Sequence, residues 1–191
     1  DSKQHTRAAP TQDMVWIPAG TFLMGSDKHY PEEAPAHQVT VDGFWMDQHT
    51  VTNEEFRKFI DATKYVTLAE RLANADDYPG AKPDLLVPAS VVFHKPRQKV
   101  DCYNWWTYVP GANWRHPEGP ANSLNGRAKH PVVHVAYEDA EAYAKWIEKE
   151  LPTEAEWELA ARGGMDGAEF VWGAIDRLRG WRSRLIHRHA I

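Results

Sequence analysis

The chain has 191 residues, of which 42% are hydrophobic and 26% charged, enough apolar material for one domain with a sizeable core and too much for a disordered chain. Its formal net charge of −5 excludes a general nucleic-acid binder, because duplex binding requires a positive patch that releases counterions. No segment approaches the roughly 18 consecutive apolar residues of a membrane span, so we expect no membrane partner.

Aromatic residues, prolines and a single cysteine characterise the composition. Nine Trp and 13 Pro indicate an irregular, loop-rich fold in which large aromatic side chains supply much of the buried area. The lone Cys102 permits no internal disulfide, and no Asn lies in a glycosylation acceptor sequence. Both features favour a cytoplasmic, bacterial setting. A secreted or periplasmic origin stays open, because the sequence does not begin with Met.

The first part of the chain predicts short strands. Residues 1–13 are polar and without pattern, so we expect a mobile arm. Two short apolar runs lie on either side of a Pro-Ala-Gly turn within Val15–Gly25, and Gln38–Asp42 alternates with period two. We expect these runs to form one small antiparallel sheet.

A first helix is predicted after these strands. Thr52 and Glu55 have the spacing of a capping box, in which the side chain of each residue accepts a hydrogen bond from the backbone amide of the other. Phe56, Phe59 and Ile60 follow at the spacing of one buried helical face. From Lys64 to Arg127 regular periodicity fades, and we predict loops rich in Pro, Gly, Asn and aromatic residues.

Two further helices are predicted beyond Arg127. His130–Val135 alternates like a strand and leads into a helix at Tyr137–Ile147. The buried face of this helix is predicted at Ala140, Tyr143, Ala144 and Ile147. Thr153 and Glu156 form a second capping box around a buried Trp157, and Gly163 is placed to end that helix. Short strands, short helices and long loops together predict an α+β domain.

Two sequence motifs are specific enough to suggest a family. They are Gly111–Pro120 (Gly-Ala-Asn-Trp-Arg-His-Pro-Glu-Gly-Pro) and Leu151–Glu158 (Leu-Pro-Thr-Glu-Ala-Glu-Trp-Glu). Together they resemble the formylglycine-generating enzymes, or sulfatase-modifying factors. The resemblance implies an α+β fold grouped with C-type lectin-like domains. It also implies oxidation of a cysteine to formylglycine within a Cys-x-Pro-x-Arg motif of an unfolded sulfatase polypeptide.

The resemblance extends over residues 14–173, where it ends with Phe170–Gly173. Residues 174–191 contain five Arg and one Asp and carry a net charge of +4 in a chain that is acidic overall. We expect this tail to be unrelated to the family, either through a shifted reading frame or as a basic extension that contacts acidic surface or nucleic acid. The domain would then lack the family's C-terminal part.

Four residues are candidates for substrate binding. Trp114 resembles the wall of the family's groove that receives the substrate proline, and Arg115 is placed to donate to peptide carbonyl groups. An alternative for Trp114 is a buried side chain that pins its loop. Ala69 matches the opposite wall, and Asn74 falls where some members have an acidic residue facing the substrate arginine. Asp76–Asp77 is a nearby source of that charge, or a solvated turn.

The family's redox chemistry finds no counterpart in these residues. The resemblance implies copper(I) held between two C-terminal thiolates, together with calcium, whereas the chain has one cysteine. We therefore predict no catalytic residue and no metal ligand here, and expect the chain by itself to be inactive. Two alternatives remain open: a non-catalytic paralogue that binds sulfatase segments, and an iron-dependent sulfur-transfer relative with the same domain type.

Two other features concern metal binding and helix capping. His130 and His134 would share one face of a strand, but no carboxylate stands at a metal-ligand spacing, so we expect His134 to satisfy its ring nitrogens locally. Ala136 stands where many family members have a serine, which implies that the following helix lacks a side-chain cap.

Overall fold

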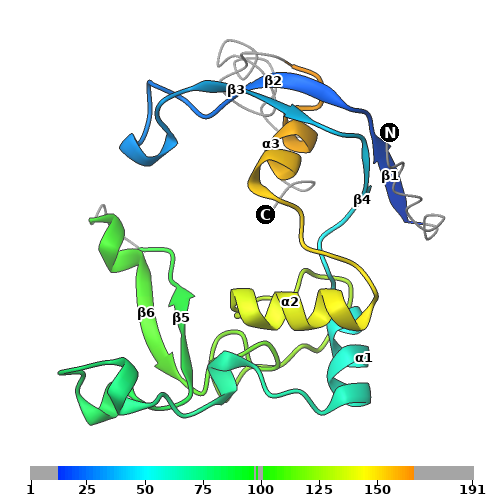
Figure 1. Ribbon diagram of the computed structural model, residues 1–191. Helices are drawn as coiled ribbons and strands as arrows, with labels where there is room; N and C mark the ends of the chain where they lie inside the picture. The colour runs from blue at the N-terminus through cyan, green and yellow to red at the C-terminus, as the bar shows by residue number, and fades with distance from the viewer. Residues whose placement is uncertain (1–12, 97, 99–100, 166–191) are drawn as a thin grey trace. The chain divides into compact units, whose positions relative to one another are not determined.

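The computed structural model describes residues 13–96, 98 and 101–165 (Figure 1). They fall into two compact units, the first made of residues 13–49 and 152–165 and the second of residues 50–151. The predicted arm (apart from Asp13), the Phe170–Gly173 motif and the basic tail lie outside the described residues. No helix within the described ranges is long and apolar enough to span a bilayer.

The first unit contains four short strands in two antiparallel pairs. The strands are β1 (Met14–Ile17), β2 (Gly20–Met24), β3 (His37–Val41) and β4 (Phe44–Asp47). The sequence predicted one sheet, but β1 pairs with β4, and β2 with β3. Pro18 lies between β1 and β2 and has no amide hydrogen to donate to a ladder, and each of these strands pairs with a different partner.

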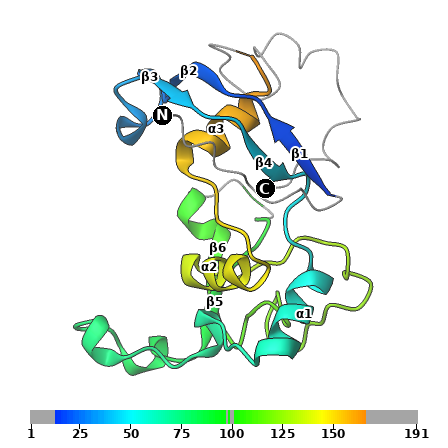
Figure 2. The same ribbon diagram turned by 45° about the vertical axis from the view of Figure 1, so that its right-hand side comes forward.

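Helix α3 (Glu154–Arg162) lies against β2 and β3 in both views (Figures 1 and 2). It begins with the predicted capping box at Thr153 and ends at Gly163, whose φ is 55°. The prediction that Trp157 is buried was wrong, because 44% of its surface is exposed. The residues of α3 that pack on the core of Phe22, Val41 and Phe44 are Ala155, Leu159 and Ala160, and Trp157 is not among them.

The second unit has an aromatic core between two helices. Helix α1 (Asn53–Thr63) starts at the predicted capping box and buries the predicted face, and helix α2 (Tyr137–Trp146) contributes Tyr143. Phe56 stacks on Tyr143 with ring centroids 5.8 Å apart. The buried members of this core are Phe56, Phe59, Ile60, Trp114, Leu124 and Tyr143.

A β-hairpin lies in the stretch for which the sequence predicted only loops. Strands β5 (Ala89–Phe93) and β6 (Trp106–Pro110) pair antiparallel, with Val91 opposite Tyr108. The connection between them is long, so the short turn motif that normally reveals a hairpin is absent. Short 3-10 helices occur at η1 (Pro31–Glu33), η2 (Leu68–Glu70), η3 (Ala75–Asp77), η4 (Pro83–Leu85) and η5 (Cys102–Trp105).

The strand predicted at His130–Val135 does not form. Its backbone makes only an isolated bridge, between Pro131 and Thr52. His134 has a φ of 58°, in the left-handed region, which cannot continue a strand. The observed elements nevertheless make the predicted architecture, an α+β fold of short antiparallel strands and short helices.

The N-terminus of α2 is capped from one side only. Ala136 occupies the N-cap with extended φ and ψ and has no side-chain acceptor, whereas the Asp139 carboxylate accepts from the Ala136 amide at 2.8 Å. We expect Ala136→Ser to raise the free energy of unfolding by about 1 kcal/mol, because the new hydroxyl accepts from the unpaired amide in the first turn. Thermal denaturation measures this change. Ala140→Ser, inside the helix, should give no gain, and an equal gain there would contradict capping as the cause.

Candidate functional site

A cavity of about 620 Å³ lies in the 50–151 unit. One wall is the segment that includes Ala69 and Asn74, and another is formed by Ser90 of β5 and Tyr108 of β6. His134 and its neighbours before α2 complete the lining. Three segments distant in sequence therefore build this cavity, whose volume suits a small molecule or a short peptide segment.

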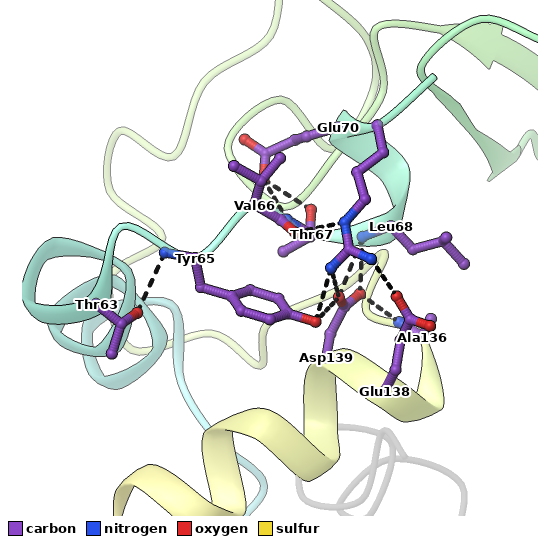
Figure 3. Close-up of polar contacts among 10 residues, drawn as sticks. Thr63, Tyr65, Val66, Thr67, Leu68, Glu70, Ala136, Glu138 and Asp139 are labelled. Atoms are coloured by element: carbon purple, nitrogen blue, oxygen red, sulfur yellow. Dashed lines mark hydrogen bonds and ion pairs between the residues drawn. The ribbon is translucent and has the colours of Figure 1, made fainter. Parts of the chain in front are cut away.

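The wall that carries Ala69 is held by a buried carboxylate (Figure 3). Asp139, which has no exposed surface, accepts from the Leu68 amide at 3.1 Å and from the Tyr65 hydroxyl at 3.0 Å. It also accepts from the Ala136 amide at 2.8 Å. A buried carboxylate is tolerated only when donors of this kind replace water. The network thus fixes the start of η2 against the start of α2.

Arg71 brings a positive charge to the same network. Its guanidinium donates to the Tyr65 hydroxyl at 2.9 Å and to Glu138 at 2.6 Å. Burial, assisted by the hydrogen bond to Asp139, raises the pKa of the Tyr65 phenol. Burial opposes the charge on Arg71, but its bond to Tyr65 and the nearby carboxylates outweigh this effect and raise the guanidinium pKa. Tyr65 therefore keeps its proton and donates it to Asp139.

A second contact links η2 to the Gly111–Pro120 loop. The Glu70 carboxylate accepts from the amide and the hydroxyl of Thr67, the latter at 2.7 Å. Its other oxygen lies 3.8 Å from Nε of Arg115. The Arg115 guanidinium in turn lies over the Trp114 ring, 4.2 Å from its centroid. Arg115 therefore bridges the cavity wall and the loop.

Trp114 lies in the core of the unit. Its side chain has no exposed surface, and Phe56 contacts it edge-on with centroids 5.3 Å apart. Its indole nitrogen is buried and has no hydrogen-bond partner within the described part of the chain. The packing matches the alternative of a tryptophan that pins its loop. Contact between this ring and a ligand would require Arg115 to leave the ring face, so the substrate-contact role of Trp114 stays a prediction.

The loop that carries Trp114 follows a tightly constrained path. Gly111 has a φ of 76°, and a Cβ atom there would lie 2.6 Å from Cγ of Pro120. The Asn113 side chain accepts from the amide of Arg115 at 2.8 Å and holds the turn. A side chain at position 111 would therefore displace the loop from its packing.

The structure separates the four predicted substrate-binding residues into two pairs. Ala69 and Asn74 line the cavity, while Trp114 and Arg115 are not part of its lining. Asn74 also has a local role, because its side chain accepts from the Asp76 amide at 3.2 Å and caps η3. Asp77 lines the cavity as well, which places a carboxylate close to Asn74.

Sequence reasoning did not place Ser90, Tyr108 or His134 in the lining. Ser90 precedes Val91-Val92-Phe93, a β-branched and aromatic run that signals a strand but does not reveal its partner. Tyr108 donates its hydroxyl to the Leu85 carbonyl at 2.7 Å. His134 was predicted to satisfy its ring nitrogens locally; both nitrogens do have partners, but these lie in segments distant in sequence, and nothing in the sequence placed His134 at a cavity.

No cluster of three or more His, Cys, Asp or Glu side chains within the described ranges is arranged to hold a metal ion. Copper(I) held between two thiolates does not fit the donors of this chain, whose 191 residues contain one cysteine, Cys102. Any such thiolate pair requires a cysteine outside these residues. We therefore derive no chemical step through copper.

Comparisons with known proteins give the family. The fold is α+β, and residues 1–189 match the family model of the sulfatase-modifying factor enzyme 1-like domain. The chain belongs to this family.

Several relatives carry descriptive names. The chain is 46% identical over 186 residues to the formylglycine-generating enzyme of Mycobacterium tuberculosis, covering 93% of this chain and 62% of the relative. It is 47% identical over 163 residues to that of Mus musculus, covering 84% and 42%. It is also 42% identical over 164 residues to the inactive C-alpha-formylglycine-generating enzyme 2 of Mus musculus, covering 84% and 50%. The chain thus spans about half the length of these relatives.

The Asp139 network can be tested by a nearly isosteric change. We expect Asp139→Asn to lower the free energy of unfolding by about 3 kcal/mol, because an amide group would face the Ala136 or Leu68 amide and the charge 4.0 Å from the Arg71 guanidinium would be lost. Urea denaturation measures the loss. Glu138→Gln removes an exposed partner of Arg71, and we expect it to cost less than about 1 kcal/mol. Equal losses in the two variants would contradict a special role for the buried carboxylate.

Proposed function

We propose that the cavity of the 50–151 unit binds an extended sulfatase segment containing Cys-x-Pro-x-Arg. In this proposal, the protein that contains this chain converts the cysteine of that segment to formylglycine. The observation that carries the proposal is the position of Ala69 and Asn74, two residues assigned to substrate binding from the family resemblance, on the wall of a cavity of about 620 Å³. The names of the relatives support the same activity.

The residues of this chain contribute recognition in this proposal. The wall offers the small side chain of Ala69, which leaves room for a peptide backbone, and polar groups from Asn74 and Ser90. The Asp139 network orders this wall before a ligand arrives, which reduces the entropy lost on binding. Oxidation of the substrate cysteine would depend on thiols outside these residues.

A second candidate is a non-catalytic paralogue that binds the same segment without converting it. The similarity of this chain to a relative named as inactive supports this second candidate. The two functions differ in one measurement, formation of an aldehyde in a Cys-x-Pro-x-Arg peptide under oxygen by the whole protein. Aldehyde formation supports the enzyme, and binding without aldehyde supports the paralogue.

Filling the cavity should weaken peptide binding. We expect Ala69→Phe to weaken binding of a peptide in which serine replaces the reactive cysteine by at least about tenfold, because the ring would occupy the space beside η2. Isothermal titration calorimetry measures the affinity. Ala62→Phe makes the same change on an exposed position of α1 and should leave the affinity unaltered. Unchanged affinity in Ala69→Phe would place the peptide elsewhere.

Restoring a carboxylate at position 74 should improve recognition of the substrate arginine. Asn74→Asp keeps the side-chain oxygen that caps η3, so we expect the fold to be retained. An exposed ion pair contributes at most about 1 kcal/mol, so we expect the affinity for the arginine peptide to rise by up to about fivefold. The same peptide with Gln in place of Arg is the control. An equal gain for both peptides would show that position 74 does not face the arginine.

A further inference from the structure

The ring of His134 is hydrogen-bonded at both nitrogens. Its Nδ1 lies 2.8 Å from Oγ of Ser90, and its Nε2 lies 2.8 Å from the carbonyl oxygen of Pro117. A carbonyl oxygen has no proton to give, so Nε2 must be the donor in its contact. In the neutral form the imidazole carries only this one proton, so Nδ1 is then an acceptor. It follows that the Ser90 hydroxyl donates its proton to His134.

The backbone around His134 fixes this arrangement. His134 has a φ of 58°, a conformation that is uncommon outside glycine but in which histidine is enriched several-fold. The segment is anchored just before it by the Val132 amide, which donates to the Val51 carbonyl at 2.9 Å. On the other side, Pro117 belongs to the constrained Gly111–Pro120 loop. The His134 backbone is thus anchored, and the ring is held by two hydrogen bonds, one to Pro117 of the loop and one to Ser90 of β5.

This arrangement has a consequence at the cavity, because Ser90 and His134 both line it. A serine hydroxyl has one proton and two lone pairs, and here the proton is committed to His134. Only the lone pairs of Oγ remain for a ligand. Ser90 can therefore accept a hydrogen bond from a bound molecule but cannot donate one. Tyr108, also in the lining, similarly commits its hydroxyl proton to a backbone carbonyl.

We infer that His134 is a positioning residue that directs the Ser90 proton away from the cavity, so that Ser90 accepts a hydrogen bond from a backbone N–H of the bound peptide. This inference rests on the proposed function, since it assigns one polar contact within the same site. A peptide backbone supplies an amide donor at nearly every residue. The Ser90 contact would therefore set the position of the peptide along the cavity, without regard to the side chain at that point.

The state of the imidazole can be measured without any peptide. In long-range proton–nitrogen NMR spectra of the protein labelled at histidine nitrogens, we expect the His134 ring at mildly alkaline pH to be a single tautomer with the proton on Nε2. Ser90→Ala should shift the Nδ1 signal and leave the Nε2 proton in place. A proton on Nδ1, or exchange between both tautomers as in free imidazole, would overturn the inference.

The contact with the ligand can be tested by methylating the peptide backbone. In a series of Cys-to-Ser peptides, each with one N-methylated amide, we expect one methylation to weaken binding to the wild type by about fivefold, the effect of one lost neutral hydrogen bond. In Ser90→Ala the same methylation should have no effect. Ser123→Ala, an exposed serine outside the lining, should retain the full fivefold difference.

The role of His134 itself requires a variant that tolerates its backbone. Glycine populates the left-handed region without strain and has no side chain to accept from Ser90, so His134→Gly frees the Ser90 proton. We expect this variant to lose most of the discrimination against the methylated peptide. Full discrimination in His134→Gly would overturn the positioning role. Failure of the wild type to bind any peptide would instead refute the proposed function, and the NMR result would still decide the tautomer.

Discussion

The 50–151 unit depends on a single buried anion. The carboxylate of Asp139 has no exposed surface, so every lone pair that loses water must find a protein donor. The donors come from Ala136 at the start of α2, and from Tyr65 and Leu68 in a segment far away in sequence. One charge therefore caps a helix and sets the position of a cavity wall. Because both tasks use the same carboxylate, the position of the wall is tied to the start of the helix.

The Gly111–Pro120 loop has a different role in the structure from the one its aromatic residue suggested. Trp114 packs into the core against Phe56, and Arg115 covers its ring and approaches Glu70 of the cavity wall. Towards the cavity, the loop presents the Pro117 carbonyl, which holds the ring of His134. Burying the indole is favourable because a large aromatic surface is removed from water. The loop thus contacts the residues around the cavity through the Pro117 carbonyl and through the guanidinium of Arg115.

The helices and their ends were predictable because their signals are local. Each capping box involves residues three apart, and the buried face of α1 repeats over one or two turns of the same helix. Pairings between distant segments were not predictable in this way. The β5–β6 hairpin closes a long connection, and β1 and β2 separate to pair with different strands. The exposure of Trp157 was missed because α3 uses other residues to contact its sheet.

The sequence by itself determined the family, the α+β class, the caps of α1 and α3 and two of the residues that line the cavity. These features depend on short motifs and on spacings within one element, which a linear sequence displays directly. Only the tertiary structure decided that Trp114 is buried, that His134 adopts a left-handed backbone and that Ser90 faces the same cavity as Ala69. Those outcomes depend on contacts between segments distant in sequence, where the burial of each side chain is settled by its partners and not by its neighbours along the chain.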